Sequence, residues 1–206
     1  VCSSDLNILP RSIVHRLKGG EKLIADSHPS VTVLFADLVG FTQLSRTMEA
    51  SRLVKMLNAI FSAFDMLVER SGLEKIKTIG DAYMVAVGCP DRRSDHAAVA
   101  ARIALGIREA ALAAFARDAL ALNIRIGVNS GLLIGGVLSG AKPTFDVWGA
   151  TVNVAARLES AALPGRILVS ASTAELLPAE FELSLGTNRE LKGVGAVSMM
   201  ELLKVS

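Results

Sequence analysis

The sequence predicts an α+β fold with a ferredoxin-like βαββαβ core and additional strands and helices at its C-terminal end. Three observations favour this fold. An apolar run of strand length precedes a long amphipathic segment with helical periodicity. Two further strand-like runs flank a Gly80-Asp81 turn. A long alanine-rich helical segment then leads into another apolar strand pattern. At 206 residues, 51% of them apolar, the chain is expected to form one domain with an aliphatic core.

The first half of the core is read as one strand followed by one helix. The strand is expected at Val31 to Asp37, where apolar residues dominate. Before it, residues 8–18 predict a short helix, with Pro10 near its start and Gly19-Gly20 at its end. After it, a helix that ends before Gly72 is indicated by apolar residues at helical spacing: Leu53, Leu57, Ile60, Phe61, Phe64, Leu67 and Val68.

The remaining elements follow from turn residues and periodicity. Ser94 or Asp95 is a suitable N-cap for the long helix that follows the second strand pair. The expected core elements are strands at 73–79 and 82–87, a helix at 94–118, and a pair of strands at 124–129 and 133–138 around Gly131. The expected C-terminal additions are a helix at 151–161, a strand at 166–169, a short helix at 172–177 and a last strand at 198–205.

This topology brings two carboxylates together. In the split βαβ plan the first and third strands are antiparallel neighbours. Asp37 ends the first strand and Asp81 begins the third, so both should lie at the same end of the sheet. Magnesium takes oxygen ligands and usually binds through one or two carboxylates plus substrate phosphates. The pair therefore predicts a site for divalent cations that hold a triphosphate.

Composition restricts the other function classes. The net charge of +2 says little about partners, but a nucleic-acid binder is usually more basic, with its charge clustered, so no nucleic-acid partner is expected. No apolar run approaches the roughly 20 residues of a membrane span, and a cytoplasmic location is expected. Residues 1–6 are expected to be a non-native leader, 7–30 the end of a transducer or linker segment, and 31–206 the catalytic domain.

Three segments resemble the catalytic domain of the class III nucleotidyl cyclases, whose fold is palm-like. They are Phe35-Ala36-Asp37-Leu38-Val39-Gly40-Phe41-Thr42, Lys77-Thr78-Ile79-Gly80-Asp81, and the run from Phe145 to Arg157. The resemblance extends over nearly the whole chain, from about Ile8 to Leu203. It implies an adenylyl cyclase that converts ATP to 3′,5′-cyclic AMP and pyrophosphate.

The resemblance implies a role for each candidate residue. Asp37, Asp81 and the Leu38 carbonyl would bind two Mg²⁺ or Mn²⁺ ions. The loop through Gly40, Phe41 and Thr42 leads into a helix, where unpaired N–H groups favour phosphate. Asn153 would orient the ribose and Arg157 would stabilise charge on the α-phosphate. They lie at i and i+4 of one helix and share a face. Lys192 matches a lysine that contacts the terminal phosphates.

The base specificity is read from Lys77 and Asp146. Lysine only donates hydrogen bonds and an ionised carboxylate only accepts them, which suits the N1 and amine of adenine. Guanylyl members of the family typically carry glutamate and cysteine at these two positions. A guanylyl cyclase is the nearest alternative. A degenerate nucleotide-binding or dimerisation module is another, because Ala141 replaces a basic residue that helps many members to bind phosphate; Lys142 is adjacent and could substitute.

The family's sites lie at a head-to-tail dimer interface. The metal-binding aspartates come from one subunit, and the base-reading and transition-state residues come from the other. This chain contains both sets, so a homodimer with two shared sites is expected. The resemblance also implies an upstream sensor or membrane domain in the full-length protein.

Overall fold

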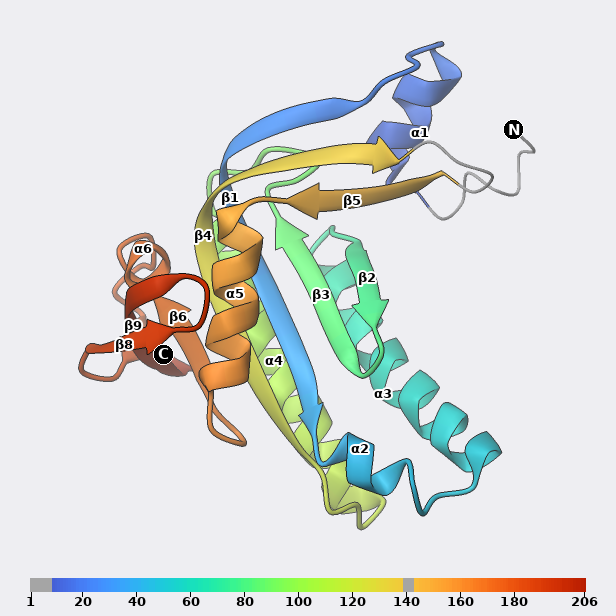
Figure 1. Cartoon of the computed structure of the whole chain (residues 1–206), viewed down its shortest axis with the longest axis vertical. Coiled ribbons are helices and arrows are strands. Elements are labelled where there is room, and N and C mark those ends of the chain that lie inside the picture. Colours follow the sequence, from blue (N-terminus) through green and yellow to red (C-terminus); the bar gives the residue numbers. More distant parts are fainter. Residues whose placement is uncertain (1–8, 139–142) are drawn as a thin grey trace.

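The computed structural model describes residues 9–138 and 143–206. Its central feature is one mixed sheet of nine strands, with helices on both faces (Figure 1). The core elements, in chain order, are β1 (Ala25–Val39), α3 (Ala50–Arg70), β2 (Lys75–Ile79), β3 (Ala82–Val87), α4 (His96–Arg117) and β4 (Asn123–Leu138). This order is the predicted βαββαβ plan.

Shorter elements surround this core. They are α1 (Arg11–Lys18), α2 (Phe41–Leu44), β5 (Thr144–Trp148), α5 (Ala150–Ala161), β6 (Ile167–Ser170), α6 (Ala171–Ala174), β7 (Phe181–Leu183), β8 (Thr187–Leu191) and β9 (Gly195–Val205). The main path of the sheet runs β2-β3-β1-β4-β6-β9-β7, while β5 pairs with β4 and β8 pairs with β9. Antiparallel pairing of β1 with β3 is confirmed, with Asp37 opposite Ala82.

The strand pair predicted around Gly131 is wrong. Residues 123–138 form a single long strand, β4, which pairs antiparallel with β1 along nearly its whole length. Gly131 is not a turn residue: it lies opposite Val31, and a Cβ there would meet Thr151 Oγ1 at 2.7 Å. The glycine therefore allows α5 to approach the sheet, and a turn was the wrong interpretation of it.

Three strands were not predicted, namely β5, β7 and β8. Each is only three to five residues long, and β8 is largely exposed. Helix α4 begins one residue after Asp95, as predicted, but the Asp95 carboxylate pairs with Arg93 and makes no capping bond. The N-terminal helix is confirmed, with Gly19 as its C-cap.

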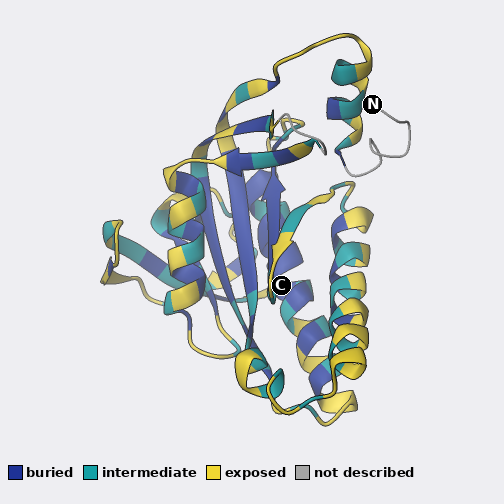
Figure 2. Cartoon of the chain, turned by 45° about the vertical axis from the view of Figure 1, so that its right-hand side comes forward, coloured by how far each residue is buried: buried dark blue, intermediate teal, exposed yellow. Residues whose placement is uncertain are grey.

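The two faces of the sheet carry two separate apolar clusters. On one face, alternate β1 residues such as Leu34 and Ala36 pack against α3 and α4. On the other face, Val33 and Phe35 pack together with residues of α1 and α5. The strands between these layers are almost wholly buried, and exposure increases on the outer sides of the helices (Figure 2). Because side chains alternate along a strand, Asp37 lies on the face that α5 covers.

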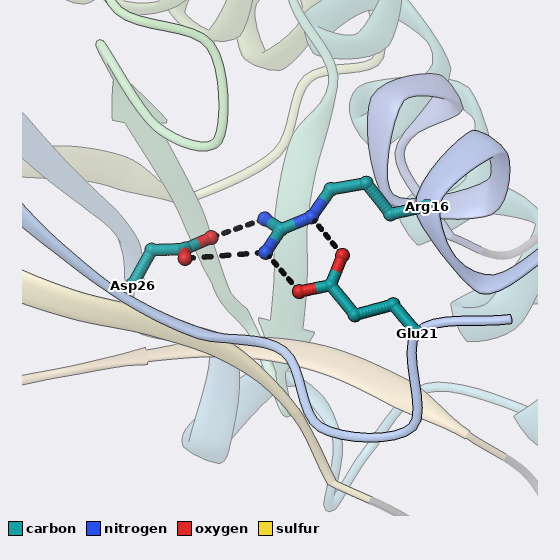
Figure 3. A network of polar contacts seen from close by, with 3 residues as sticks. All are labelled: Arg16, Glu21 and Asp26. Carbon is teal, nitrogen blue, oxygen red and sulfur yellow. Dashed lines mark hydrogen bonds and ion pairs between the residues drawn. The ribbon is translucent and has the colours of Figure 1, made fainter. Parts of the chain in front are cut away.

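Helix α1 is linked to the start of β1 by ion pairs of one arginine, Arg16. Arg16 donates hydrogen bonds to Glu21 over 2.7 and 2.6 Å, and it forms an ion pair with Asp26 (Figure 3). Arg16 lies on the helix, Glu21 on the connecting segment and Asp26 on the strand. This network fixes α1 beside the arm of the sheet that β1, β4 and β5 form. Among the described helices, none is both long and apolar enough to span a membrane.

Candidate active site

Asp37 and Asp81 lie at the same end of the sheet, as predicted. Asp37 is opposite Ala82 in the β1–β3 register, so the adjacent Asp81 in the β2–β3 turn is brought close to it. Burial raises the pKa of Asp81, and the negative charge of Asp37 raises it further. Two carboxylates that repel each other in a half-buried position favour a cation between them.

A guanidinium balances part of this negative charge. Arg125 on β4 lies opposite Asp37 in the β1–β4 register. Its Nε and Nη2 donate to Asp37 Oδ2 over 3.0 and 2.8 Å. The Nε atom is also 2.6 Å from Glu159 Oε1 on α5. Sequence reasoning missed both Arg125 and Glu159. The available signal was a charge between two buried apolar residues, Ile124 and Ile126, of a strand.

Glu159 is a buried carboxylate with an unusual environment. Its side chain is 10% exposed, and desolvation raises its pKa to about 7 even though the Arg125 charge opposes the shift. The Nε–H of Arg125 is directed to Asp37, so Glu159 Oε1 accepts no hydrogen bond among the described residues despite its close charge contact. The Glu159 carboxylate therefore forms an ion pair with Arg125, but its Oε1 atom is left without a hydrogen-bond donor among the described residues.

The loop after β1 has the predicted form. Gly40 adopts φ +93°, and a Cβ there would lie 3.2 Å from the Ala121 carbonyl oxygen, so glycine is required. The four-residue helix α2 begins at Phe41. Phe41 is half-buried against the α3/α4 cluster, and Thr42 is exposed. Leu38 is buried, immediately next to Asp37.

Lys77 and Asp146 are in direct contact. Lys77 Nζ donates to Asp146 Oδ2 over 2.5 Å, although 69 residues separate them in the sequence. Asp146 is held in place because its Oδ1 accepts from its neighbour's N–H, that of Val147, over 2.8 Å. The side chains of Lys77 and Asp146 are 39% and 17% exposed. The structure thus joins the two residues that the sequence assigned to base recognition.

This pair lies in the wall of a cavity of about 1340 Å³. The cavity is bounded by residues of β2 and β5, by Asp65 and Glu69 near the end of α3, and by Leu9 and Arg11 at the start of α1. It is large enough for a nucleoside, because ligand pockets typically measure roughly 300–1,000 Å³. Among its described lining residues are Lys77 and Asp146, the two residues predicted to recognise the base.

Asn153 and Arg157 lie on the exposed side of α5. Their spacing of four residues places them on one face, while Ala155 and Glu159 face the sheet. The helix approaches the sheet closely because Gly127 on β4 has no side chain. A Cβ at Gly127 would lie only 2.1 Å from the Glu159 nitrogen and 2.3 Å from the Ala155 oxygen.

The fold does not bring all candidates together within one subunit. Among the interactions of the described residues, Asn153, Arg157 and Lys192 make no side-chain hydrogen bond or ion pair with the other candidates. Lys192 is exposed and follows β8, on the other side of β4 from β2 and β3. Ala141 and Lys142 lie outside the described residues. The candidates thus fall into three separate groups. Asp37 and Asp81 form the acidic end of the sheet, Lys77 and Asp146 form the pair predicted to recognise the base, and Asn153 and Arg157 lie on the exposed face of α5.

The residues at the acidic end fit a divalent cation. No group of three or more His, Cys, Asp or Glu side chains in residues 9–138 and 143–206 could hold a metal by itself. Two converging carboxylates beside a backbone carbonyl suit an ion whose remaining ligands come from water or phosphate, which is the usual magnesium arrangement. Asp37, Asp81 and the Leu38 carbonyl are the groups that would hold it.

A ferredoxin-like core with paired aspartates at the ends of adjacent strands defines a class of phosphoryl-transfer domains. Within that class, the chain belongs to the adenylate and guanylate cyclase catalytic domain family, whose model matches residues 23–204. An adenylate cyclase of Mycobacterium tuberculosis is 39% identical over 198 residues. The match covers 96% of this chain but only 45% of that relative, so the chain spans less than half of its length.

Solved structures give the same family. The guanylate cyclase domain of RhGC from Catenaria anguillulae, in complex with GTP, superposes with a TM-score of 0.82 and 34% identity, covering 88% of this chain and 100% of that one. The adenylyl cyclase CyaB from P. aeruginosa gives a TM-score of 0.80 and 26% identity, covering 88% and 97%. The expected family and fold are confirmed. Because both adenylyl and guanylyl cyclases are similar, the base specificity must be argued from the site.

Proposed function

We propose that this chain is the catalytic domain of an adenylyl cyclase, which converts ATP to 3′,5′-cyclic AMP and pyrophosphate. The observation that supports ATP is the contact between Lys77 Nζ and Asp146 Oδ2 in the wall of the cavity. This contact places one donor-only group beside one acceptor-only group. Adenine presents the complementary pair, an acceptor at N1 and a donor at its exocyclic amine.

The same pair disfavours guanine. At the two positions that adenine would present, guanine carries the opposite groups: its N1 is a donor and its O6 is an acceptor. Placed as adenine would be, guanine would set its N1–H against the donor-only Lys77 and its O6 against the acceptor-only Asp146. A base that leaves polar groups unpaired is rejected by a factor of roughly 10⁴–10⁵ in sites of this kind. In this structure the two side chains form a hydrogen bond with each other.

We assign to the other residues the roles that the family resemblance implies. Asp37 and Asp81, with the Leu38 carbonyl, would hold two Mg²⁺ or Mn²⁺ ions. Bound there, these ions would supply charge stabilisation to the triphosphate and activate the ribose 3′-hydroxyl. The Gly40–Thr42 loop would bind phosphate through its backbone N–H groups. Asn153 would orient the ribose, Arg157 would stabilise the α-phosphate and Lys192 would contact the terminal phosphates.

A homodimer would complete two such sites. Asn153 and Arg157 point away from the sheet that carries Asp37 and Asp81, so they are available to a second subunit. Exposed apolar side chains on the β4–β5 arm, Leu132, Ile134, Leu138 and Trp148, offer a surface for that contact. An upstream sensor or membrane domain would control the pairing, and a cytoplasmic location would give the domain access to ATP.

The decisive experiment compares the products formed from ATP and from GTP. The protein at high concentration, with Mn²⁺, should form cyclic AMP from ATP and little cyclic GMP from GTP, as measured by mass spectrometry. An excess of cyclic GMP would favour the guanylyl cyclase alternative and refute the base assignment. No product from either nucleotide, with a dimer confirmed by light scattering, would favour a degenerate module.

A further inference from the structure

Helix α5 serves the acidic end of its own subunit as well as presenting Asn153 and Arg157. Glu159 is two residues after Arg157, which turns its side chain by about 200° around the helix, toward the sheet. Its backbone nitrogen lies against Gly127, and its carboxylate reaches Arg125, two residues earlier on the same face of β4. The three residues form a connection from α5 to Asp37.

Arg125 contacts two carboxylates, those of Asp37 and Glu159. Both of its hydrogen bonds in this cluster go to Asp37 Oδ2. Glu159 Oε1 is closer to Nε, at 2.6 Å, but receives no hydrogen bond from it. A small rotation of the guanidinium would transfer the Nε–H from Asp37 to Glu159. A buried acceptor left without a hydrogen bond is unfavourable, so an unused acceptor at this distance is a ready second partner.

We propose that Glu159 is a positioning residue of the active site, which receives the Arg125 guanidinium when Asp37 ligates a divalent cation. This inference rests on the proposed function, since it takes Asp37 as a metal ligand. In this structure Arg125 pairs with Asp37 and balances its charge. Metal binding requires that contact to be given up, and Glu159 keeps the displaced guanidinium bound and its charge balanced beside the incoming cation.

The local charges give the expected direction of the effect. With Glu159 ionised, the cluster of Asp37, Asp81, Arg125 and Glu159 carries three negative charges and one positive charge. Glu159→Gln removes one negative charge and leaves Arg125 with Asp37 as its only carboxylate partner. Both changes oppose a dication. A charge in direct contact shifts the proton affinity of a carboxylate by roughly 1–3 pK units. Because Glu159 contacts Arg125 and not the cation, we expect an effect at the low end of that range, so Mn²⁺ affinity should fall about tenfold.

The test measures Mn²⁺ binding directly, from the loss of the free-ion EPR signal, without nucleotide and at pH 8. At that pH Glu159 is ionised, since its pKa is about 7. E159Q should bind Mn²⁺ about tenfold more weakly than the wild type. R125Q should bind it more tightly, because the competing guanidinium is gone. E159Q in the R125Q background should cause a smaller further loss than in the wild type, because only the effect of the removed negative charge remains once Arg125 is absent.

The controls separate this inference from the proposed function. Glu180→Gln breaks a comparable 2.6 Å ion pair with Arg102 of α4, which belongs to the opposite face of the sheet, and should leave Mn²⁺ affinity unchanged. Thermal unfolding in EDTA reports any purely structural loss. Asp37→Asn should abolish Mn²⁺ binding.

The outcomes differ for the two claims. If E159Q binds Mn²⁺ like the wild type while D37N does not bind it, the role of Glu159 is wrong and the metal site stands. If D37N binds like the wild type, Asp37 is no ligand and the proposed function loses its metal site, along with the inference. If E159Q lowers stability but not affinity, Glu159 is merely structural and the inference fails.

Discussion

The contact between Gly127 and helix α5 allows a quantitative test of the structure. A methyl group at residue 127 would lie 2.1 Å from the Glu159 nitrogen, 2.3 Å from the Ala155 oxygen and 2.8 Å from the Glu159 Cα. All three are backbone atoms of α5, so no side-chain rotation relieves the overlap. To restore an ordinary contact of about 3.4 Å, the helix must retreat by about 1.3 Å.

This displacement should damage stability and activity to different extents. Overpacking a well-packed interior typically destabilises by about 1–3 kcal/mol, and a rigid backbone contact belongs at the upper end of that range. We therefore expect Gly127→Ala to lower the free energy of unfolding by about 3 kcal/mol. Because α5 carries Asn153 and Arg157, a shift of about 1 Å should also lower cyclase activity by on the order of 100-fold.

The assay is urea unfolding at equilibrium, with cyclase activity measured on the folded fraction. Gly106→Ala is the matched control. Gly106 lies inside α4, where an added Cβ would meet only the flexible Leu67 side chain at 3.4 Å. That change should be neutral, or stabilising by up to about 1 kcal/mol through helix propensity. Wild-type stability in G127A would refute the close packing of α5 on β4, whatever the enzyme's activity.

Three further predictions concern the site and the core. Lys77→Glu combined with Asp146→Cys should lower cyclic AMP formation and raise cyclic GMP formation; unchanged nucleotide preference by mass spectrometry would contradict the base assignment. Inactive Asp37→Ala and Arg157→Ala proteins should regain activity when mixed, and a mixture that dimerises yet stays inactive would exclude sites shared between subunits. Burial lowers the pKa of His96 below its usual 6.5. As the pH falls, the unfolded state therefore binds the proton before the folded state does. The free energy of unfolding should decline as the pH falls below about 6.5. Urea unfolding between pH 5 and 7.5 should show a shallower decline in His96→Gln, and equal slopes would refute the burial of a neutral imidazole.

Much of the fold was predictable because its signals are local. Periodic apolar residues predicted α3 and α4, and the Gly80-Asp81 turn predicted the β2–β3 hairpin. Gly131 misled the prediction, since a glycine in an extended strand and a glycine in a turn look alike in sequence. The short strands β5, β7 and β8 lack a pattern long enough to detect, because their pairing with longer strands determines them.

By itself, the sequence determined the family, the order of the core elements and the residue types available for catalysis, because motifs and periodicity are encoded by neighbouring residues. The order of the elements also predicted that Asp37 and Asp81 meet, but only the tertiary structure decided the other long-range contacts of the site. Lys77 reaches Asp146 across 69 residues, and Arg125 reaches Asp37 across 88. Such contacts depend on strand register and on how closely α5 packs against β4. These are properties of the assembled sheet, in which a shift of one residue would turn each side chain to the opposite face.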